Sequence, residues 1–166
     1  MIVDEKREIS LKTMAVTYYP GIKHQTMILD VDGSFLTSKS PERLFEEACL
    51  KHGSTYEGRR QAVIHVRQYW KRTPFAIAPL FGMYVFPSAS PRDLDCVWLF
   101  AHHVLDILPD AMNKQHSIVK FRNDKELPVK ATATFLDNQY ERTGACFLRF
   151  GPLELFRPND ECFCNT

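Results

Sequence analysis

The chain has 166 residues, of which 45% are hydrophobic and 12% aromatic, and its formal net charge is +1 at pH 7. This length and composition suffice for one globular domain whose core needs no disulfide bonds. The sequence has no apolar run of about 18 residues, and the N-terminal MIVDEKREIS is too charged for a signal peptide, so we expect a cytoplasmic protein without membrane association.

Short β-rich runs bounded by proline, glycine or a turn pair predict strands along most of the chain. They lie at residues 13–19, 25–31, 75–78, 83–86, 96–104, 117–122 and 126–130. The loop at residues 20–24 joins the first two runs into a hairpin, and a second hairpin begins at Gly33. Asn123-Asp124 predicts the turn between the last two runs.

Helix signals occur between these runs. Ser40 followed by Pro41 is typical of an N-cap with proline at the first helical position, which predicts a helix at residues 41–52. Residues 133–149 have a mostly apolar stripe at helical spacing, formed by Leu136, Tyr140, Thr143 and Phe147. We therefore expect a single α+β domain, with an antiparallel sheet built from hairpins and two to three packed helices.

The segment at residues 51–72 contains six cations and a single acid, a local charge of +5 in a chain whose total is +1. Such a concentration of positive charge is typical of a surface that binds a polyanion such as nucleic acid. On a helix, Arg60, Arg67 and Lys71 fall within about 40° of one another and form one basic stripe. The adjoining face is apolar and contains Ala62, Val63, Val66, Tyr69 and Trp70. An ordinary solvated helix face is the alternative.

We expect the two tryptophans, Trp70 and Trp98, to lie in the core, because both sit in apolar stripes or runs. For Trp70 a second interpretation stays open, namely a wedge that inserts between base steps of DNA.

Five scattered cysteines argue against a disulfide framework, and we expect mostly buried, reduced thiols. Cys162 and Cys164 are too close together for a zinc knuckle and have no second ligand pair. His102 and His103 are adjacent on a predicted strand, where neighbouring side chains point to opposite faces. We therefore expect structural histidines, no metal site and no cofactor.

One motif favours a different function. MILDVDGSFL at residues 27–36 resembles the first motif of haloacid dehalogenase phosphatases, in which Asp30 would be the nucleophile and Asp32 the general acid and base beside Mg²⁺. That chemistry also needs a downstream acidic pair on a parallel sheet with crossover helices, which the hairpin spacing does not provide. The alternative is that Asp30, Asp32 and Gly33 form a turn.

Several short stretches, in this order and at similar intervals, carry a resemblance to one family. They are residues 53–60 (GSTYEGRR), Pro74, Phe86-Pro87, residues 96–98 (CVW), 125–129 (KELPV) and 138–143 (NQYERT). Together these stretches resemble the ComK family of bacterial competence transcription factors over roughly residues 13–150. We accordingly divide the chain into a flexible N-terminus at 1–12, the ComK-like DNA-binding domain at 13–150 and a short C-terminal tail at 151–166.

The resemblance implies a DNA-binding activator of genes for DNA uptake, without catalysis, that recognises paired AT-rich boxes largely through the minor groove. It also implies self-association on DNA and control by adaptor-mediated proteolysis. A narrow AT-rich minor groove attracts arginine, which agrees with the basic residues of this chain. The tail is shorter and less basic than we associate with the family, so full activation and control by a proteolysis adaptor are not carried over.

The expected DNA contacts divide into two groups. For phosphates we expect contacts from Lys51, Lys71 and Arg72. For the groove we expect contacts from Arg59, Arg60, Arg67 and Arg142. Asn138 and Gln139 could bond base edges or phosphates, or could serve in capping or packing. A protein-interaction module without DNA contact is a third possibility beside the regulator and the phosphatase.

Overall fold

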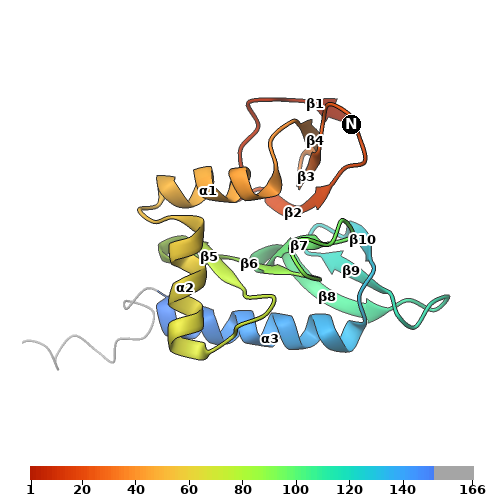
Figure 1. The fold of residues 1–166 in the computed structure, drawn as a ribbon. Coiled ribbons are helices and arrows are strands. Elements are labelled where there is room, and N and C mark those ends of the chain that lie inside the picture. The colour runs from red at the N-terminus through yellow and green to blue at the C-terminus, as the bar shows by residue number, and fades with distance from the viewer. Residues whose placement is uncertain (152–166) are drawn as a thin grey trace, which may run out of the picture.

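A computed structural model describes residues 1–151, which form an α+β domain with ten strands, three helices and two short 3₁₀ turns (Figure 1). The helices are α1 (Pro41–Lys51), α2 (Tyr56–Arg67) and α3 (Ala133–Phe150), and the 3₁₀ turns are η1 (Pro79–Phe81) and η2 (Ala101–His103). The strands are β1 (Ile2–Val3), β2 (Thr13–Tyr18), β3 (Thr26–Asp30), β4 (Gly33–Thr37), β5 (Phe75–Ala78), β6 (Met83–Pro87), β7 (Val97–Phe100), β8 (Val104–Pro109), β9 (Ser117–Phe121) and β10 (Glu126–Val129). The expected fold class is confirmed.

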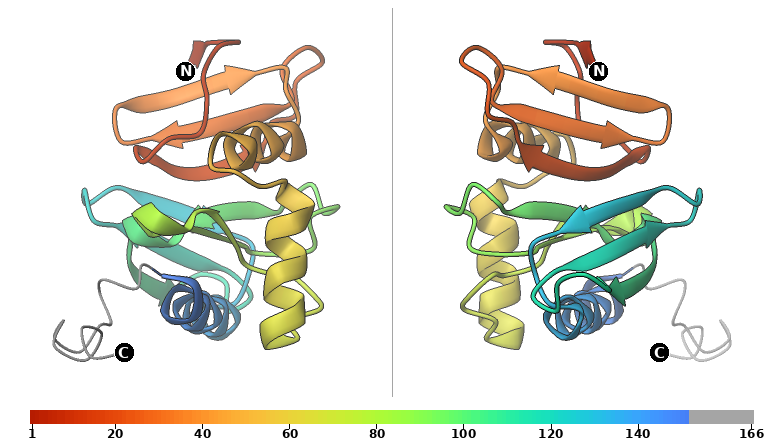
Figure 2. Two further views of the ribbon diagram at one scale, coloured as in Figure 1. Left: turned by 90° about the vertical axis from the view of Figure 1, so that its left-hand side faces the viewer. Right: turned by 90° about the vertical axis from the view of Figure 1, so that its right-hand side faces the viewer.

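The strands form two sheets. A seven-stranded sheet has the order β1-β4-β3-β2-β7-β6-β5, and a three-stranded sheet has the order β10-β9-β8. All pairs are antiparallel except β1 with β4. Helix α3 packs against β6 and β8, whereas α1 and α2 pack against β5. Figure 2 shows α3 end-on at the bottom of the molecule, beside the lower end of α2.

Local sequence signals explain where the helices begin. The Ser40 hydroxyl accepts a hydrogen bond from the Arg43 N–H at 3.2 Å, so the predicted N-cap of α1 is confirmed. Thr55 and Thr132 cap α2 and α3 in the same way. The predicted hairpins β2–β3 and β9–β10 are also confirmed, and Asp124 takes a positive φ in the second of these turns. A strand does begin at Gly33 as predicted, but it pairs with the preceding strand β3 and does not start a separate hairpin.

Aromatic side chains fill the largest part of the core. Trp98 is 1% exposed and packs against Tyr18 and Phe45, so its predicted core position is confirmed. A separate small cluster of Val63, Tyr84 and Cys146 joins α2 and α3 to the outer strands of the sheet. This cluster fixes α2 relative to α3 and thereby positions the candidate site.

The strand predicted at residues 96–104 is wrong in its length. Two strands occupy this stretch, β7 in the large sheet and β8 in the small one, and η2 separates them. The chain changes sheets at η2, because a single straight strand could not pair with both β2 and β9. An uninterrupted apolar run does not reveal such a break.

Residues 1–12, for which we expect flexibility, make several contacts with the large sheet. β1 pairs with β4, Ile9 is buried in the core, and Arg7 forms an ion pair with Asp30. No helix within residues 1–151 is both long and apolar enough to cross a bilayer.

Candidate nucleic-acid interface

Helix α2 ends earlier than the basic stripe requires. Gln68 takes a left-handed conformation with φ of 59°, and its N–H donates to the Ile64 carbonyl, which closes the helix at Arg67. The single helical stripe of Arg60, Arg67 and Lys71 is therefore wrong. The chain turns here because Thr73 and Pro74 must enter the core ahead of β5.

The predicted core position of Trp70 is also wrong, because its side chain is 70% exposed. Trp70 follows the end of α2 and so does not share the face of that helix that buries Val63 and Ile64. It lies in the loop at residues 68–72, next to Lys71 and Arg72.

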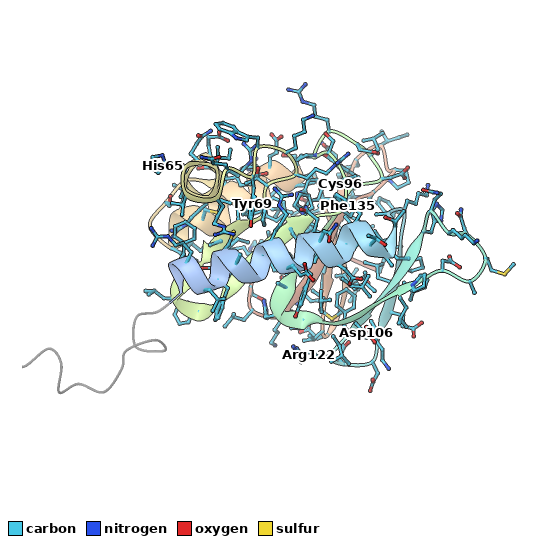
Figure 3. All side chains as sticks on the ribbon, turned by 90° about the horizontal axis from the view of Figure 1, so that it is seen from below. His65, Tyr69, Cys96, Asp106, Arg122 and Phe135 are labelled. Atoms are coloured by element: carbon cyan, nitrogen blue, oxygen red, sulfur yellow. The ribbon has the colours of Figure 1, made fainter. Side chains whose placement is uncertain are left out.

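Four of the predicted cations come together around this loop. We call Arg67, Lys71, Arg72 and Arg142 the cation cluster. The guanidinium carbons of Arg142 and Arg67 lie 4.1 and 5.4 Å from the centre of the Tyr69 ring, so both make cation–π contacts with it. In Figure 3, Tyr69 lies between the end of α2 and the middle of α3.

Hydrogen bonds fix the two arginines that contact Tyr69. Arg67 donates to the Tyr69 hydroxyl at 3.0 Å, which raises the pKa of the guanidinium. Arg142 donates to the Gln139 side-chain oxygen at 2.7 Å and to the Lys71 carbonyl at 3.4 Å. Partial burial lowers the pKa of Arg142.

Gln139 stabilises the cation cluster through hydrogen bonds. Its buried amide donates to the carbonyl oxygens of Arg72 at 2.8 Å and Pro87 at 2.9 Å. Of the two interpretations of Gln139, packing is therefore the one found in this structure. Because one side chain joins the loop, β6 and Arg142, the loop conformation depends on α3. The guanidinium of Arg72 in turn lies 5.1 Å from the Phe135 ring centre on the same helix.

The other predicted contact residues lie outside the cation cluster. Lys51, at the end of α1, forms an ion pair with Glu8, and Arg60 forms one with Glu57 at 2.6 Å. Arg59 donates to the His52 carbonyl at 2.9 Å. Asn138 is exposed on α3, one turn before Arg142.

The profile of one protein family, described as ComK protein, matches residues 4–151. The chain belongs to the ComK family. A relative from Bacillus subtilis (strain 168), named "Competence transcription factor", is 25% identical over 116 residues, which are 70% of this chain and 59% of the relative. The chain thus spans less than two thirds of that relative's length. No solved structure matches it.

In this ComK-family chain the phosphatase-like motif has a structural role. Asp30 is fully buried at the end of β3, where its carboxylate accepts from Arg7 Nε at 2.8 Å. Arg7 also donates to Asp32 at 2.9 Å, so one guanidinium bridges both aspartates. The motif lies in the antiparallel hairpin β3–β4, whereas the phosphatase mechanism requires a parallel sheet. Within residues 1–151, no three histidine, cysteine or acidic side chains are grouped as a metal site requires.

The two adjacent histidines do not point apart as predicted. They lie in η2, not in a strand, and Nε2 of both His102 and His103 is within hydrogen-bond distance of the Leu11 carbonyl, at 3.0 and 2.6 Å. Their rings lie 4.2 Å apart between centres. The predicted structural role is retained, although the geometry differs. The cysteine pair at 162 and 164 lies outside the described residues.

Of the residues that build this surface, the Tyr69 ring had no expected part in DNA contact, whereas the sequence left open a wedge for Trp70 and a bond to base edges or phosphates for Gln139. A sequence signal did exist for Gln139, since residues 138–143 belong to the family-like stretches. No local pattern, however, indicates that residue 69 faces residue 142.

Proposed function

We propose that this ComK-family protein binds AT-rich duplex DNA and regulates transcription of genes for DNA uptake. The observation that carries the proposal is the cation cluster around Tyr69, with Trp70 exposed beside it. Cations grouped on one surface attract the phosphate backbone, and arginines in particular enter the narrow minor groove of AT-rich DNA.

Arg67 and Arg142 are suited to groove contacts because their guanidinium groups are already oriented. Each makes a cation–π contact with Tyr69 and at least one hydrogen bond. A side chain that is ordered before binding loses less conformational entropy when it enters the groove. Lys71 and Arg72, on the exposed loop, are suited to phosphates on either side of that groove.

Trp70 supports recognition through the minor groove. Proteins that bind this groove frequently insert an apolar side chain between two base steps and kink the duplex. A tryptophan that is 70% exposed and followed directly by two cations, Lys71 and Arg72, has the shape and surroundings for this role. The flexible pyrimidine–purine steps of AT-rich sites make such a kink less costly.

The remaining predicted contacts stay part of the proposal with a secondary role. Lys51 would contact a flanking phosphate, and Arg59 and Arg60 would contact the groove, after exchanging their present partners, which include Glu8 and Glu57. Asn138 would bond a base edge or a phosphate next to Arg142. Self-association on paired boxes and a cytoplasmic location belong to the same proposal.

The test is fluorescence anisotropy with two duplexes of equal length, one carrying paired AT-rich boxes and one GC-rich, at several salt concentrations. We expect tighter binding to the AT-rich duplex, and log K should fall with log[salt] by about 0.9 for each phosphate neutralised. Equal binding to both duplexes would remove the AT preference from the proposal. Failure to bind either duplex at low salt would overturn it.

A further inference from the structure

A cavity of about 450 Å³ opens between α2, β5, η1 and the end of α3. Its lining residues are apolar except for His52 and Arg59. On the η1 side of the cavity, Leu80 and Phe81 are 75% and 64% exposed. Exposed apolar side chains that gather around a hollow, and are not scattered singly, are typical of an interaction site.

The polar side of this cavity has one accessible cation. The His52 carbonyl accepts a hydrogen bond from Nη2 of Arg59 at 2.9 Å, and the His52 ring packs edge-on against Phe81 with 5.9 Å between centres. Nε of Arg59 is buried, whereas Nη1 has no hydrogen-bond partner among the described residues and stays accessible. The acid nearest to it along the helix, Glu57, is paired with Arg60. Nη1 of Arg59 is therefore available to an anion that lies on an apolar surface.

The chain leaves α3 at this cavity. Phe150, the last residue of α3, lines the cavity and packs against the small cluster that joins α2 to α3. Figure 1 shows this end of α3 next to α2. The Gly151 N–H donates to the Phe147 carbonyl at 2.8 Å and closes the helix end. The residues that follow Gly151 therefore begin beside the cavity.

Those next residues, which lie outside the described part of the chain, match the lining in kind. Residues 153–156 are Leu-Glu-Leu-Phe, three apolar side chains with one acid. The cavity offers the complement, an apolar lining with one cation. Four residues of extended chain span up to about 14 Å, more than the width of about 10 Å of a round cavity of 450 Å³. Glu154 is thus within reach of Arg59 from a chain anchored at Phe150.

We propose that residues 153–156 dock into this cavity of their own chain. An extended segment presents alternate side chains to opposite sides. Leu153 and Leu155 lie against η1, and Glu154 pairs with Nη1 of Arg59 on the α2 side. Because the segment is tethered directly to α3, its effective concentration at the cavity is high, and contacts too weak to join separate molecules suffice within one chain.

This docking is a contact within the chain and goes beyond the proposed DNA binding. While Glu154 holds Arg59, that arginine is not available for the groove contact proposed above. Docking is therefore measured without DNA, so that failure of one proposal leaves the other intact.

The test is methyl NMR of the full chain at two protein concentrations. We expect nuclear Overhauser contacts from the methyl groups of Leu153 and Leu155 to those of Leu80 and to the Phe81 ring, at equal strength at both concentrations. Contacts that grow with concentration, or that join differently labelled chains in a mixture, would place the segment in the cavity of a second copy and overturn docking within the chain. Absence of these contacts at both concentrations overturns it as well.

A charge exchange tests the ion pair. Glu154→Lys should abolish the contacts because it places two cations together, and Glu154→Lys combined with Arg59→Glu should restore them. Glu161→Lys, the same charge change farther along the same segment, is the matched control and should leave them intact. Should the double variant fail to fold by circular dichroism, the single Glu154→Lys variant decides. Contacts that survive in Glu154→Lys, or that Glu161→Lys removes equally, overturn the pairing with Arg59.

Discussion

The guanidinium of Arg142, on α3, stacks on the ring of Tyr69, in the loop after α2, with 4.1 Å between its carbon and the ring centre. This contact joins two segments that are 73 residues apart in the chain and orients one arginine that has no acidic partner among residues 1–151. An arginine held by an aromatic ring keeps its full charge available for phosphate, whereas one paired with a carboxylate must first break an ion pair. The contact therefore distinguishes Arg142 from Arg60, which is paired with Glu57.

Arg142→Ala should weaken binding to the AT-rich duplex by about ten- to a hundredfold and should reduce the preference for it over the GC-rich duplex. The reason is the loss of a preordered groove contact. Anisotropy titrations of both duplexes measure this effect. Lys23→Ala, which removes the same charge from the loop between β2 and β3, is the control and should change little. Equal effects of the two substitutions would indicate general charge attraction without groove recognition.

Trp70→Ala should leave the fold intact while weakening DNA binding. An exposed side chain contributes little to stability, so the free energy of unfolding in urea should change by less than about 0.5 kcal/mol. Trp98→Ala, at the fully buried position, should lower that free energy by about 3–5 kcal/mol. In a Trp98→Phe background, the fluorescence of Trp70 should be quenched by stacking when AT-rich DNA is added. Unchanged emission at saturating DNA would exclude a wedge.

Gln139→Leu should loosen the loop at residues 68–72. The substitution leaves the carbonyls of Arg72 and Pro87 without their donor, at a cost of about 1–3 kcal/mol for each that stays buried. The rate of amide hydrogen exchange should rise in this loop, and the protein should unfold at a lower urea concentration. Asn138→Ala, at the neighbouring exposed position, should alter neither exchange nor unfolding.

Asp30→Asn should destabilise the protein without removing any enzymatic activity. Asp30 is buried against Arg7, and weakening this pair should lower the free energy of unfolding by about 1–3 kcal/mol, less than for a fully buried pair, because Arg7 is a quarter exposed. Asp32→Asn, at a half-exposed side chain, should cost less. Phosphate release from an aryl phosphate with Mg²⁺ is measured in parallel. Release by the wild type that Asp30→Asn abolishes would instead support the phosphatase hypothesis.

The three described cysteines should resist modification in the folded state. Burial raises the pKa of Cys49 to about 12 and those of Cys96 and Cys146 to about 11. A thiol whose pKa is higher in the folded than in the unfolded chain contributes fully to stability below the unfolded value of about 9. That contribution is lost as the pH rises from about 9 toward 11–12.

In a Cys162→Ser, Cys164→Ser background, a thiol reagent at pH 8 should therefore react slowly with the native protein and fully in urea. The urea concentration at the midpoint of unfolding should also decrease as the pH is raised from 9 to 10. Rapid reaction of any of the three thiols without denaturant would contradict their burial.

Short-range signals predicted most of the fold. Ser40-Pro41 determines the start of α1 through one hydrogen bond and one fixed φ, and Asn123-Asp124 permits the turn of the last hairpin. Such features depend on neighbours in sequence, so they can be recognised there. The break at η2 depends instead on which sheet pairs with each half of the run, and this is a long-range property.

The candidate site was predicted less well for the same reason. The local charge of residues 51–72 correctly indicated cations on the surface. The sequence pattern alone, however, predicted a helix that continues past residue 67, whereas α2 ends there. Gln68 is neither glycine nor proline, so the local sequence gives no sign of its left-handed conformation. The same turn brings Tyr69 under Arg142 and exposes Trp70, so one missed residue changed the positions of both aromatics.

Helix α3 carries Arg142 of the cation cluster, and the same helix packs against β6 and β8. The buried Gln139 amide, also on α3, donates to the carbonyl of Arg72. A shift of α3 would therefore displace Arg142 and the loop at residues 68–72 together, so damage to the core beneath this helix should reach the cation cluster even where no residue of the cluster is changed.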